Sequence, residues 1–239
     1  MEFIVVGSSS KGNCYILKGA EDSLVLECGV RLSDMEKMID YDIRSIRCVL
    51  VSHKHGDHAK YVKDYSKVFP IMAPRDVMED LGSGYSFHPV DYGTTYKVGE
   101  FNITPFQLEH DCPCSGYQIS SRSGNILFIT DTGRIDYKFG PVDHVLVECN
   151  WTEKALMRAI KEGRTDVSQL TRLSSTHLSL ESCKEFLTGV QGIDDVVLLH
   201  LSDRNSDYEE ILEGVRGVTG KPTYIADKNL KITWDSKEK

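Results

Sequence analysis

A cluster of side chains able to bind a metal ion lies in the first quarter of this 239-residue chain. His53, His55, Asp57 and His58 fall within six residues, directly after the apolar run 46–51. A run rich in Val, Leu and Ile predicts a buried strand, so the cluster lies where that strand ends at a glycine-containing turn. Alternate residues of an extended segment point the same way, so two of these ligands can hold one ion while the others turn toward a second. The alternative is a solvated histidine-rich turn, which is uncommon at this density of ligands.

Imidazole and carboxylate ligands together favour zinc and also suit manganese or iron. Four ligands cannot complete two metal sites, so we expect further ligands at the ends of other strands. His110, Asp131 and His200 each follow a predicted apolar strand. Taken singly, each could be an ordinary loop residue or helix cap, but their shared position at the carboxyl ends of strands favours a role as ligands.

Short apolar runs bounded by Gly, Ser, Asn or Asp predict strands along most of the chain. Ser or Asn caps with Glu three residues on predict helices. The best marked are at about 151–162, with Asn150 as the cap, and at 206–216, with Ser206 as the cap, and Ser179 is expected to cap another. The sequence shows no internal repeat and no long linker. We therefore expect a single domain over 1–239, mixing strands and helices, with an apolar fraction of 40% that can bury a substantial core.

Composition limits the cellular setting and the partners. No basic leader or long apolar stretch is present, which predicts a soluble, unprocessed chain. Seven scattered cysteines favour a reducing cytoplasm over a disulfide framework. The net charge of -8 argues against a broad basic face for duplex DNA. It does not exclude a nucleic-acid substrate, because two divalent cations would add about four positive charges at one point.

The order and spacing of these ligands resemble those of the metallo-β-lactamase superfamily over nearly the whole chain. The resemblance implies an α+β fold, a four-layer αββα sandwich, without a large inserted domain. It implies two bound divalent metal ions with these ligands: His53, His55 and His110 for the first ion, Asp57, His58 and His200 for the second, and Asp131 bridging both.

Two further features resemble the YycJ-type branch of that superfamily, which is related to RNase J and RNase Z. They are the segment 7–15 and the paired motifs His177-Leu178-Ser179 and His200-Leu201-Ser202. This branch is associated with cleavage of DNA phosphodiesters, including 5′-to-3′ exonuclease action. We therefore expect a phosphodiesterase or nuclease acting on DNA in preference to RNA, through a hydroxide that bridges the metals, with no membrane partner.

Other functions are compatible with the same ligands. One alternative is an acyl hydrolase, such as a lactonase, thioesterase or glyoxalase-like enzyme, because a metal-activated hydroxide attacks carbonyl carbon equally well. Another is a binding protein that has lost catalysis, although the complete ligand set argues against it. A diiron oxygen-reducing centre is disfavoured because such members usually have Glu where His55 stands. The sequence leaves the oligomeric state open.

Several residues around the ligands have two readings each. Asp57 and His177 are the candidate catalytic residues, and His177 could equally be a plain residue at the start of a helix. Glu27 stands where the family usually has an Asp that orients the ligands from behind, and it could instead be an ordinary strand-end acid. The segment containing Ser10, Lys11 and Asn13 could bind a substrate phosphate or form a simple hairpin loop. We expect His88 and His144 to be structural and Cys112-Pro113-Cys114 to form a loop near the site.

Overall fold

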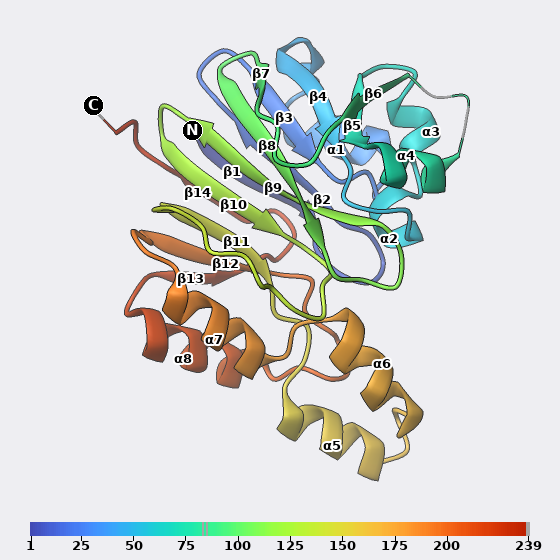
Figure 1. Ribbon diagram of the computed structural model, residues 1–239, viewed down its shortest axis with the longest axis vertical. Helices are drawn as coiled ribbons and strands as arrows, with labels where there is room; N and C mark the ends of the chain where they lie inside the picture. Colours follow the sequence, from blue (N-terminus) through green and yellow to red (C-terminus); the bar gives the residue numbers. More distant parts are fainter. Residues whose placement is uncertain (83, 85, 238–239) are drawn as a thin grey trace. The chain divides into compact units, whose positions relative to one another are not determined.

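The computed structural model describes residues 1–82, 84 and 86–237 (Figure 1). The chain divides into two compact units. The first comprises Met1–Gln107, Cys112–Gly124 and Ala226–Lys239, and the second comprises Leu108–Asp111 and Asn125–Ile225. Each unit is built around its own set of strands with helices packed on them.

The first unit contains a complete seven-stranded mixed sheet. Its strands, in spatial order, are β14 (Lys231–Thr233), β1 (Glu2–Gly7), β2 (Cys14–Lys18), β3 (Ser23–Leu26), β4 (Ile46–Leu50), β5 (Ile71–Pro74) and β6 (Phe87–Val90). Pairing is antiparallel from β14 to β3 and parallel from β3 to β6. The helical segments of this unit are α1 (Leu32–Met38), the 3-10 turn η1 (Ile43–Ser45), α2 (Gly56–Ala59), α3 (Val62–Tyr65) and α4 (Arg75–Leu81). The unit also holds β7 (Tyr96–Val98), β8 (Phe101–Leu108, up to Gln107) and β9 (Cys114–Ser121).

Both faces of the inner strands β2 to β5 of the first sheet are largely buried. On one face, strand residues such as Val25 and Val49 pack with Met35 of α1 and Tyr65 of α3 in one apolar cluster. Their neighbours on the opposite face, among them Leu24, are equally inaccessible. Burial on both faces explains why the β4 run is almost continuously apolar, since a strand with one wet face would alternate with polar residues. This is the arrangement expected for an inner layer of a sandwich.

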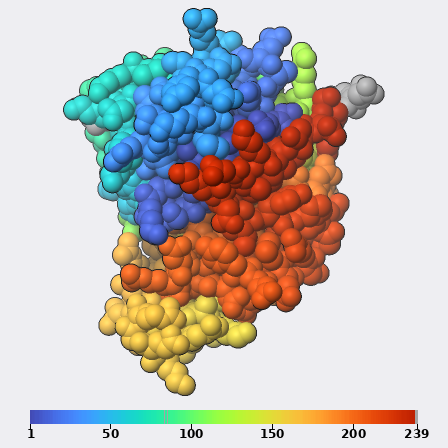
Figure 2. Space-filling model, turned by 180° about the vertical axis from the view of Figure 1, so that it is seen from behind, coloured from blue at the N-terminus to red at the C-terminus, as the bar shows by residue number. Residues whose placement is uncertain are grey.

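The end of the chain closes the first sheet. Figure 2 shows the C-terminal segment, in red, lying beside the N-terminal residues, in blue. The backbones of Met1 and Trp234 exchange two hydrogen bonds of 2.7 Å, and the Trp234 ring stacks on Phe3 with centroids 5.7 Å apart. These contacts give the edge of the sheet a paired partner strand.

The second unit is built on four parallel strands. These are β10 (Gly124–Ile129, from Asn125 onward), β11 (His144–Glu148), β12 (Asp195–Leu199) and β13 (Thr223–Ile225), paired in that order. The helices are α5 (Glu153–Lys161), α6 (Ser168–Thr176), α7 (Leu180–Gly189) and α8 (Tyr208–Thr219). Helices α7 and α8 pack against each other, and α8 contacts β13 (Figure 1). Parallel pairing brings the carboxyl ends of these strands to one edge, which is where sites form in such sheets.

The helices predicted from caps at Asn150, Ser179 and Ser206 are confirmed, and two of the three caps are shifted. Ser179 caps α7 as expected, accepting a hydrogen bond from the Ser182 amide. Helix α5 is capped by Thr152 in place of the expected Asn150, and α8 is capped by Asp207 in place of the expected Ser206. The chain offers two capping residues within a few positions at the start of each of these two helices, and tertiary contacts decide which one is used.

The strands of the described residues belong to two mixed seven-stranded sheets with flanking helices, and no large insertion interrupts them. The predicted α+β class is therefore confirmed. None of the helices in the described part of the chain has the length and apolarity that crossing a membrane requires.

Candidate metal centre

In the first unit, the predicted ligand cluster forms a tight turn at the end of β4. The ring centroid of His53 lies 4.7 Å from that of His55 and 4.2 Å from that of His58. Asp57 Oδ2 lies 3.4 Å from His58 Nε2. His53 and His58 are fully buried, whereas the Asp57 side chain is 20% exposed. The structure thus gathers all four residues within one short segment, with part of the group open to solvent.

Backbone hydrogen bonds from two neighbouring segments hold this turn in place. Asn13 N donates to Asp57 O over 2.7 Å, and Cys28 N donates to His58 O over 2.8 Å. A Cβ atom at Gly29 would come within 1.7 Å of Asp57 O, so only glycine allows the two backbones to approach this closely. The position of the ligands is therefore set by backbone packing as well as by their own side chains.

Glu27 lies behind the ligands. It is fully buried, and both its carboxylate oxygens lie 3.3 Å from the Ser52 amide. Glu27 Oε2 is 3.7 Å from His58 Nδ1, and Ser52 Oγ is 2.8 Å from His53 Nδ1. Glu27 has a φ of 66°, a left-handed conformation that is unusual for a residue with a side chain. Contacts such as those from Glu27 to His58 and from Ser52 to His53 fix the ring orientation of metal-binding histidines.

The loop that was expected to bind substrate has one buried and two exposed members. Ser10 and Lys11 are exposed, whereas Asn13 is fully buried. Asn13 Nδ2 lies 3.0 Å from His58 Nε2 and 3.4 Å from Asp57 Oδ2. Asn13 therefore contacts two of the expected ligands directly, and Ser10 and Lys11 are the members of the loop that solvent reaches.

In the second unit, three strand ends bring together two carboxylates and one imidazole. The register aligns Ile129 with Val147 and Val147 with Leu198, so the residues just beyond emerge at the same edge of the sheet. They are Asp131, Glu148 and His200. His200 Nδ1 lies 3.2 Å from Asp131 Oδ1 and 3.1 Å from Glu148 Oε1. All three residues are nearly inaccessible to solvent.

Asn150 fixes the backbone of His200. Its side-chain amide donates to His200 O over 2.8 Å, which explains why Asn150 does not cap α5. His200 has a φ of 53°, the second left-handed non-glycine residue among the predicted site residues. Unusual backbone conformations of this kind concentrate at functional sites, where surrounding contacts stabilise them.

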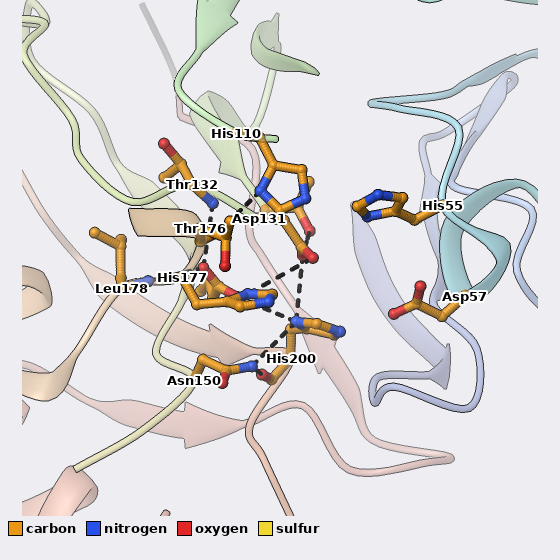
Figure 3. Close-up of polar contacts among 12 residues, drawn as sticks. His55, Asp57, His110, Asp131, Thr132, Asn150, Thr176, His177, Leu178 and His200 are labelled. Atoms are coloured by element: carbon orange, nitrogen blue, oxygen red, sulfur yellow. Dashed lines mark hydrogen bonds and ion pairs between the residues drawn. The ribbon is translucent and has the colours of Figure 1, made fainter. Parts of the chain in front are cut away.

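His177 lies against the same acids, at the junction of α6 and α7. Its Nδ1 is 2.5 Å from Glu148 Oε1 and 3.7 Å from Asp131 Oδ2. The other Glu148 oxygen accepts hydrogen bonds from the Leu178 amide over 3.0 Å and the Thr132 amide over 3.3 Å. Figure 3 shows His110, Asp131, His177 and His200 directed toward one another from separate segments of this unit. His177 is therefore a member of this group and not merely a residue that precedes a helix.

The charges in this group shift the pKa of its members. Burial lowers the pKa of His177, but the charge of Glu148, its hydrogen bond and the charge of Asp131 outweigh burial, and the net pKa is raised above the ordinary 6.5. Burial raises the pKa of Glu148, and the charge of His177 with the hydrogen bonds from His177 and His200 brings the net value below 4.5. Both shifts favour a charged imidazolium beside a charged carboxylate.

His110 also belongs to the second unit. Its side chain is almost fully buried, and Nδ1 lies 3.0 Å from Thr176 O. Burial lowers the pKa of His110, despite the charges of Asp131 and Asp111. A neutral imidazole held through one nitrogen by a carbonyl is the usual form of a metal-binding histidine.

Glu148 is the functional candidate that sequence reasoning missed. It ends a predicted strand just as Asp131 and His200 follow theirs, so the strand-end criterion could have found it. Asn150 was read as a helix cap, and no local signal distinguishes a cap from a residue that holds a backbone carbonyl at a site. His88 is exposed on β6, and His144 is buried against Asp195 at 3.0 Å, as a structural histidine would be.

The donor chemistry of both units fits divalent metal ions. Imidazole nitrogens and carboxylate oxygens are ligands for zinc, manganese and iron. Within the second unit, Asp131, Glu148, His177 and His200 each offer one ligand atom, all within 4.8 Å of one another. Cys112 and Pro113 lie in a loop that leads into β9, whose first residue is Cys114, and Cys112 Sγ lies 3.9 Å from His55 Nε2.

Buried histidine and acidic clusters at strand ends, on two mixed sheets with flanking helices, define the metal-dependent hydrolases of the metallo-β-lactamase fold. The chain belongs to that superfamily, since the family described as "Beta-lactamase superfamily domain" matches residues 30–201. The predicted resemblance to this superfamily is confirmed.

Solved structures of this fold match nearly the full length of the chain. The metallo-beta-lactamase fold protein YhfI from Bacillus subtilis is 17% identical, with a TM-score of 0.75 over 97% of this chain and 99% of that one. Zn(2+)-bound PqqB from Methylobacterium extorquens is 13% identical, with a TM-score of 0.72 over 98% and 100%. Human tRNase Z, short form, is 14% identical, with a TM-score of 0.63 over 98% and 100%. At these identities the likeness shows the fold.

One curated relative is similar in sequence. Exodeoxyribonuclease YycJ from Bacillus anthracis is 23% identical over 147 residues. The match covers 56% of this chain, and the chain spans about half the length of that relative, 56%.

Proposed function

We propose that this chain is a dinuclear metal-dependent phosphodiesterase that cleaves DNA, with 5′-to-3′ exonuclease action. The observation that carries the proposal is the pair of part-buried His177 and buried Glu148, in contact with Asp131, a predicted metal ligand. A histidine fixed in this way can assist the departure of an oxygen from phosphorus, which a bare metal-binding site lacks. The sequence similarity to an exodeoxyribonuclease supports DNA as the substrate.

The proposed ligands are His53, His55, Asp57 and His58 in the first unit and His110, Asp131 and His200 in the second. Zinc fits this donor set best, and manganese or iron would also be accepted. When bound, two such ions acidify a water and polarise a phosphate oxygen.

The residues of the chain then have separate tasks. Glu148 holds Nδ1 of His177, so the opposite ring nitrogen, Nε2, is the atom that would donate a proton to the oxygen leaving phosphorus. The negative charge of Glu148 balances the imidazolium before that transfer. The His177 side chain is 17% exposed, which lets a substrate reach it. Exposed Lys11 would contact a phosphate, while Asp57, also partly exposed, would complete the catalytic set.

All seven cysteines lie within the described residues, and all are thiols, six of them buried. We therefore also propose the cytoplasm as the compartment, where thiols stay reduced.

One panel of measurements tests the function. Bound metal is measured by elemental analysis on the sample that is assayed against 5′-labelled single-stranded DNA, a model phosphodiester and a lactone. We expect about two ions per chain and turnover of both phosphodiesters. His177→Ala should lower DNA turnover about 10²- to 10⁴-fold, the usual contribution of a general acid. The matched control His88→Ala removes an exposed histidine and should leave turnover unchanged.

The proposal fails if DNA turnover is normal after alanine replacement of both Asp57 and His58. Turnover of the lactone alone would instead indicate an acyl hydrolase with the same metal ligands.

A further inference from the structure

The cluster of Asp131, Glu148, His177 and His200 is called the His177 group. A groove beside it has no role in the function proposed above. It lies entirely within the second unit, between the loop 133–139 and helix α7, and its volume is about 930 Å³. Binding sites for small ligands occupy about 300–1,000 Å³. The groove is thus large enough for part of a substrate.

Three aromatic rings line the groove in succession. Tyr137 and Phe139 have ring centroids 6.0 Å apart and planes inclined by 32°. Phe139 meets Phe186 of α7 edge to face, with centroids 6.2 Å apart. Tyr137 is 45% exposed although its side chain is large. A row of aromatic faces is the feature on which unpaired nucleic-acid bases stack.

The side chains around the groove carry positive and negative charges in equal number, so the net charge of its lining is close to zero. Arg134 is bonded to Asp136 through paired contacts of 2.6 and 2.7 Å, and Lys138 is accompanied by Glu185. A groove with balanced charges suits a neutral, flat group better than a phosphate. Gln191 also lines the groove and offers both a donor and an acceptor, as the edge of a base requires.

The lining of the groove includes sequence neighbours of the proposed catalytic residues. Its lining includes Gly133, two residues after Asp131, and Leu178, directly after His177. A Cβ atom at Gly133 would come within 2.2 Å of Ser175 O, so the loop is packed tightly against the segment that leads to His177. A group in this groove would therefore be a near neighbour of a phosphate held at the His177 group.

We propose that this groove binds one unpaired base of single-stranded DNA, the base next to the phosphate that is cleaved. Tyr137 and Phe139 would stack on the base, and the adjoining backbone would be delivered to His177. The inference rests on the proposed nuclease function for the identity of the substrate. It adds that the enzyme selects strands whose bases are free to leave a duplex.

The test measures binding and cleavage separately. The affinity of fluorescein-labelled single-stranded DNA is measured by anisotropy for the wild type, Tyr137→Ala and Tyr137→Phe, in calcium buffer to slow turnover. Each protein is then assayed with intact strands and with strands that carry one abasic position, moved along the sequence. The matched control is Tyr208→Ala, which removes a tyrosine of similar exposure, 41%, at the start of α8.

Stacking of one base on an aromatic side chain typically changes affinity about tenfold or more. We expect Tyr137→Ala to bind about tenfold more weakly, Tyr137→Phe to bind like the wild type, and Tyr208→Ala to be unaffected. The wild type should also cleave more slowly at one abasic position, and Tyr137→Ala should lose that discrimination.

Unchanged DNA affinity in Tyr137→Ala would overturn the groove proposal, even if the protein cleaves DNA normally. The same holds if the wild type binds no DNA, if abasic strands bind as tightly as intact ones, or if Tyr137→Ala changes only the oligomeric state. Binding that depends on Tyr137 without any DNA cleavage would support the groove and refute the nuclease function, so the two failures are distinguishable.

Discussion

Replacing Glu148 by glutamine tests the buried group of the second unit. The change keeps the size of the side chain and removes its charge. In the wild type, Oε1 faces Nδ1 of His177 and of His200, while Oε2 accepts from the amides of Leu178 and Thr132. A glutamine amide has a single acceptor oxygen, so one side of the group keeps its acceptor and the other faces an NH₂ group that cannot accept.

The expected loss follows from these contacts. About two hydrogen bonds to a charged acceptor disappear, each contributing about 1.5–3 kcal/mol, and breaking a buried ion pair typically costs about 3–5 kcal/mol. We expect the free energy of unfolding to fall by about 3–5 kcal/mol at pH 5.5. That is a large part of the total stability of about 5–15 kcal/mol that is common for folded proteins.

The loss should depend on pH. The pKa of His177 is raised above 6.5, so its contribution to stability is complete below pH 6.5 and disappears as pH rises through the raised value. The pKa of Glu148 is lowered below 4.5, so its contribution is complete above pH 4.5 and disappears as pH falls through the lowered value. The difference between wild type and variant should therefore be largest between these values and smaller at pH 8.5.

The assay is urea unfolding of metal-free protein in the presence of EDTA, followed by tryptophan fluorescence from pH 4 to 9. The matched control is Glu181→Gln, whose wild-type carboxylate is 73% exposed and paired with Lys184, and which should change stability by less than about 1 kcal/mol. A loss of under about 1 kcal/mol for Glu148→Gln at pH 5.5, or an equal loss at pH 5.5 and 8.5, would refute the reasoning.

Three further predictions concern other parts of the molecule. Gly29→Ala should lower stability by several kcal/mol and reduce bound metal, because its Cβ would collide with Asp57 O; thermal unfolding and elemental analysis check this, with Gly140→Ala, where a Cβ meets open space, as the control. His144→Ala should lower the free energy of unfolding by about 2–3 kcal/mol by leaving the buried Asp195 without its partner, yet leave turnover per folded molecule unchanged in a steady-state assay. Removing metal with EDTA should abolish turnover and lower the melting temperature, and added zinc should restore both. The stability lost should be about 4 kcal/mol for an ion that was present at a thousand times its Kd. Persistent activity without metal would contradict this.

The sequence predicts the first half of the site well because the information is local. His53, His55, Asp57 and His58 are adjacent, and their density alone indicates a metal-binding segment. Asp131 and His200 are recognisable because each follows a clear apolar strand. Glu148 also stands at the end of an apolar strand, so the same criterion would have included it. Its contacts with His177 and His200, which are distant in the sequence, are visible only in the folded chain.

The helices also divide into those with local sequence signals and those that depend on contacts between distant residues. Helix α7 was predicted from Ser179 because a cap and an apolar periodicity are local signals. Helix α6 was not predicted, since it is mostly exposed and its cap residue, Val167, makes no side-chain cap hydrogen bond. The use of Thr152 in place of Asn150 as a cap depends on the bond between Asn150 and the His200 carbonyl, which only the folded chain reveals.

The left-handed backbones of Glu27 and His200 make the side-chain contacts at these two positions a condition of the local fold. A side chain in this conformation costs about 1–2 kcal/mol relative to glycine. The buried contacts of Glu27 with Ser52 and His58, and of His200 with Glu148, offset that cost. A glycine at either position would relieve the backbone and lose those contacts, so a screen that enriches heat-resistant variants without demanding activity should still retain both side chains.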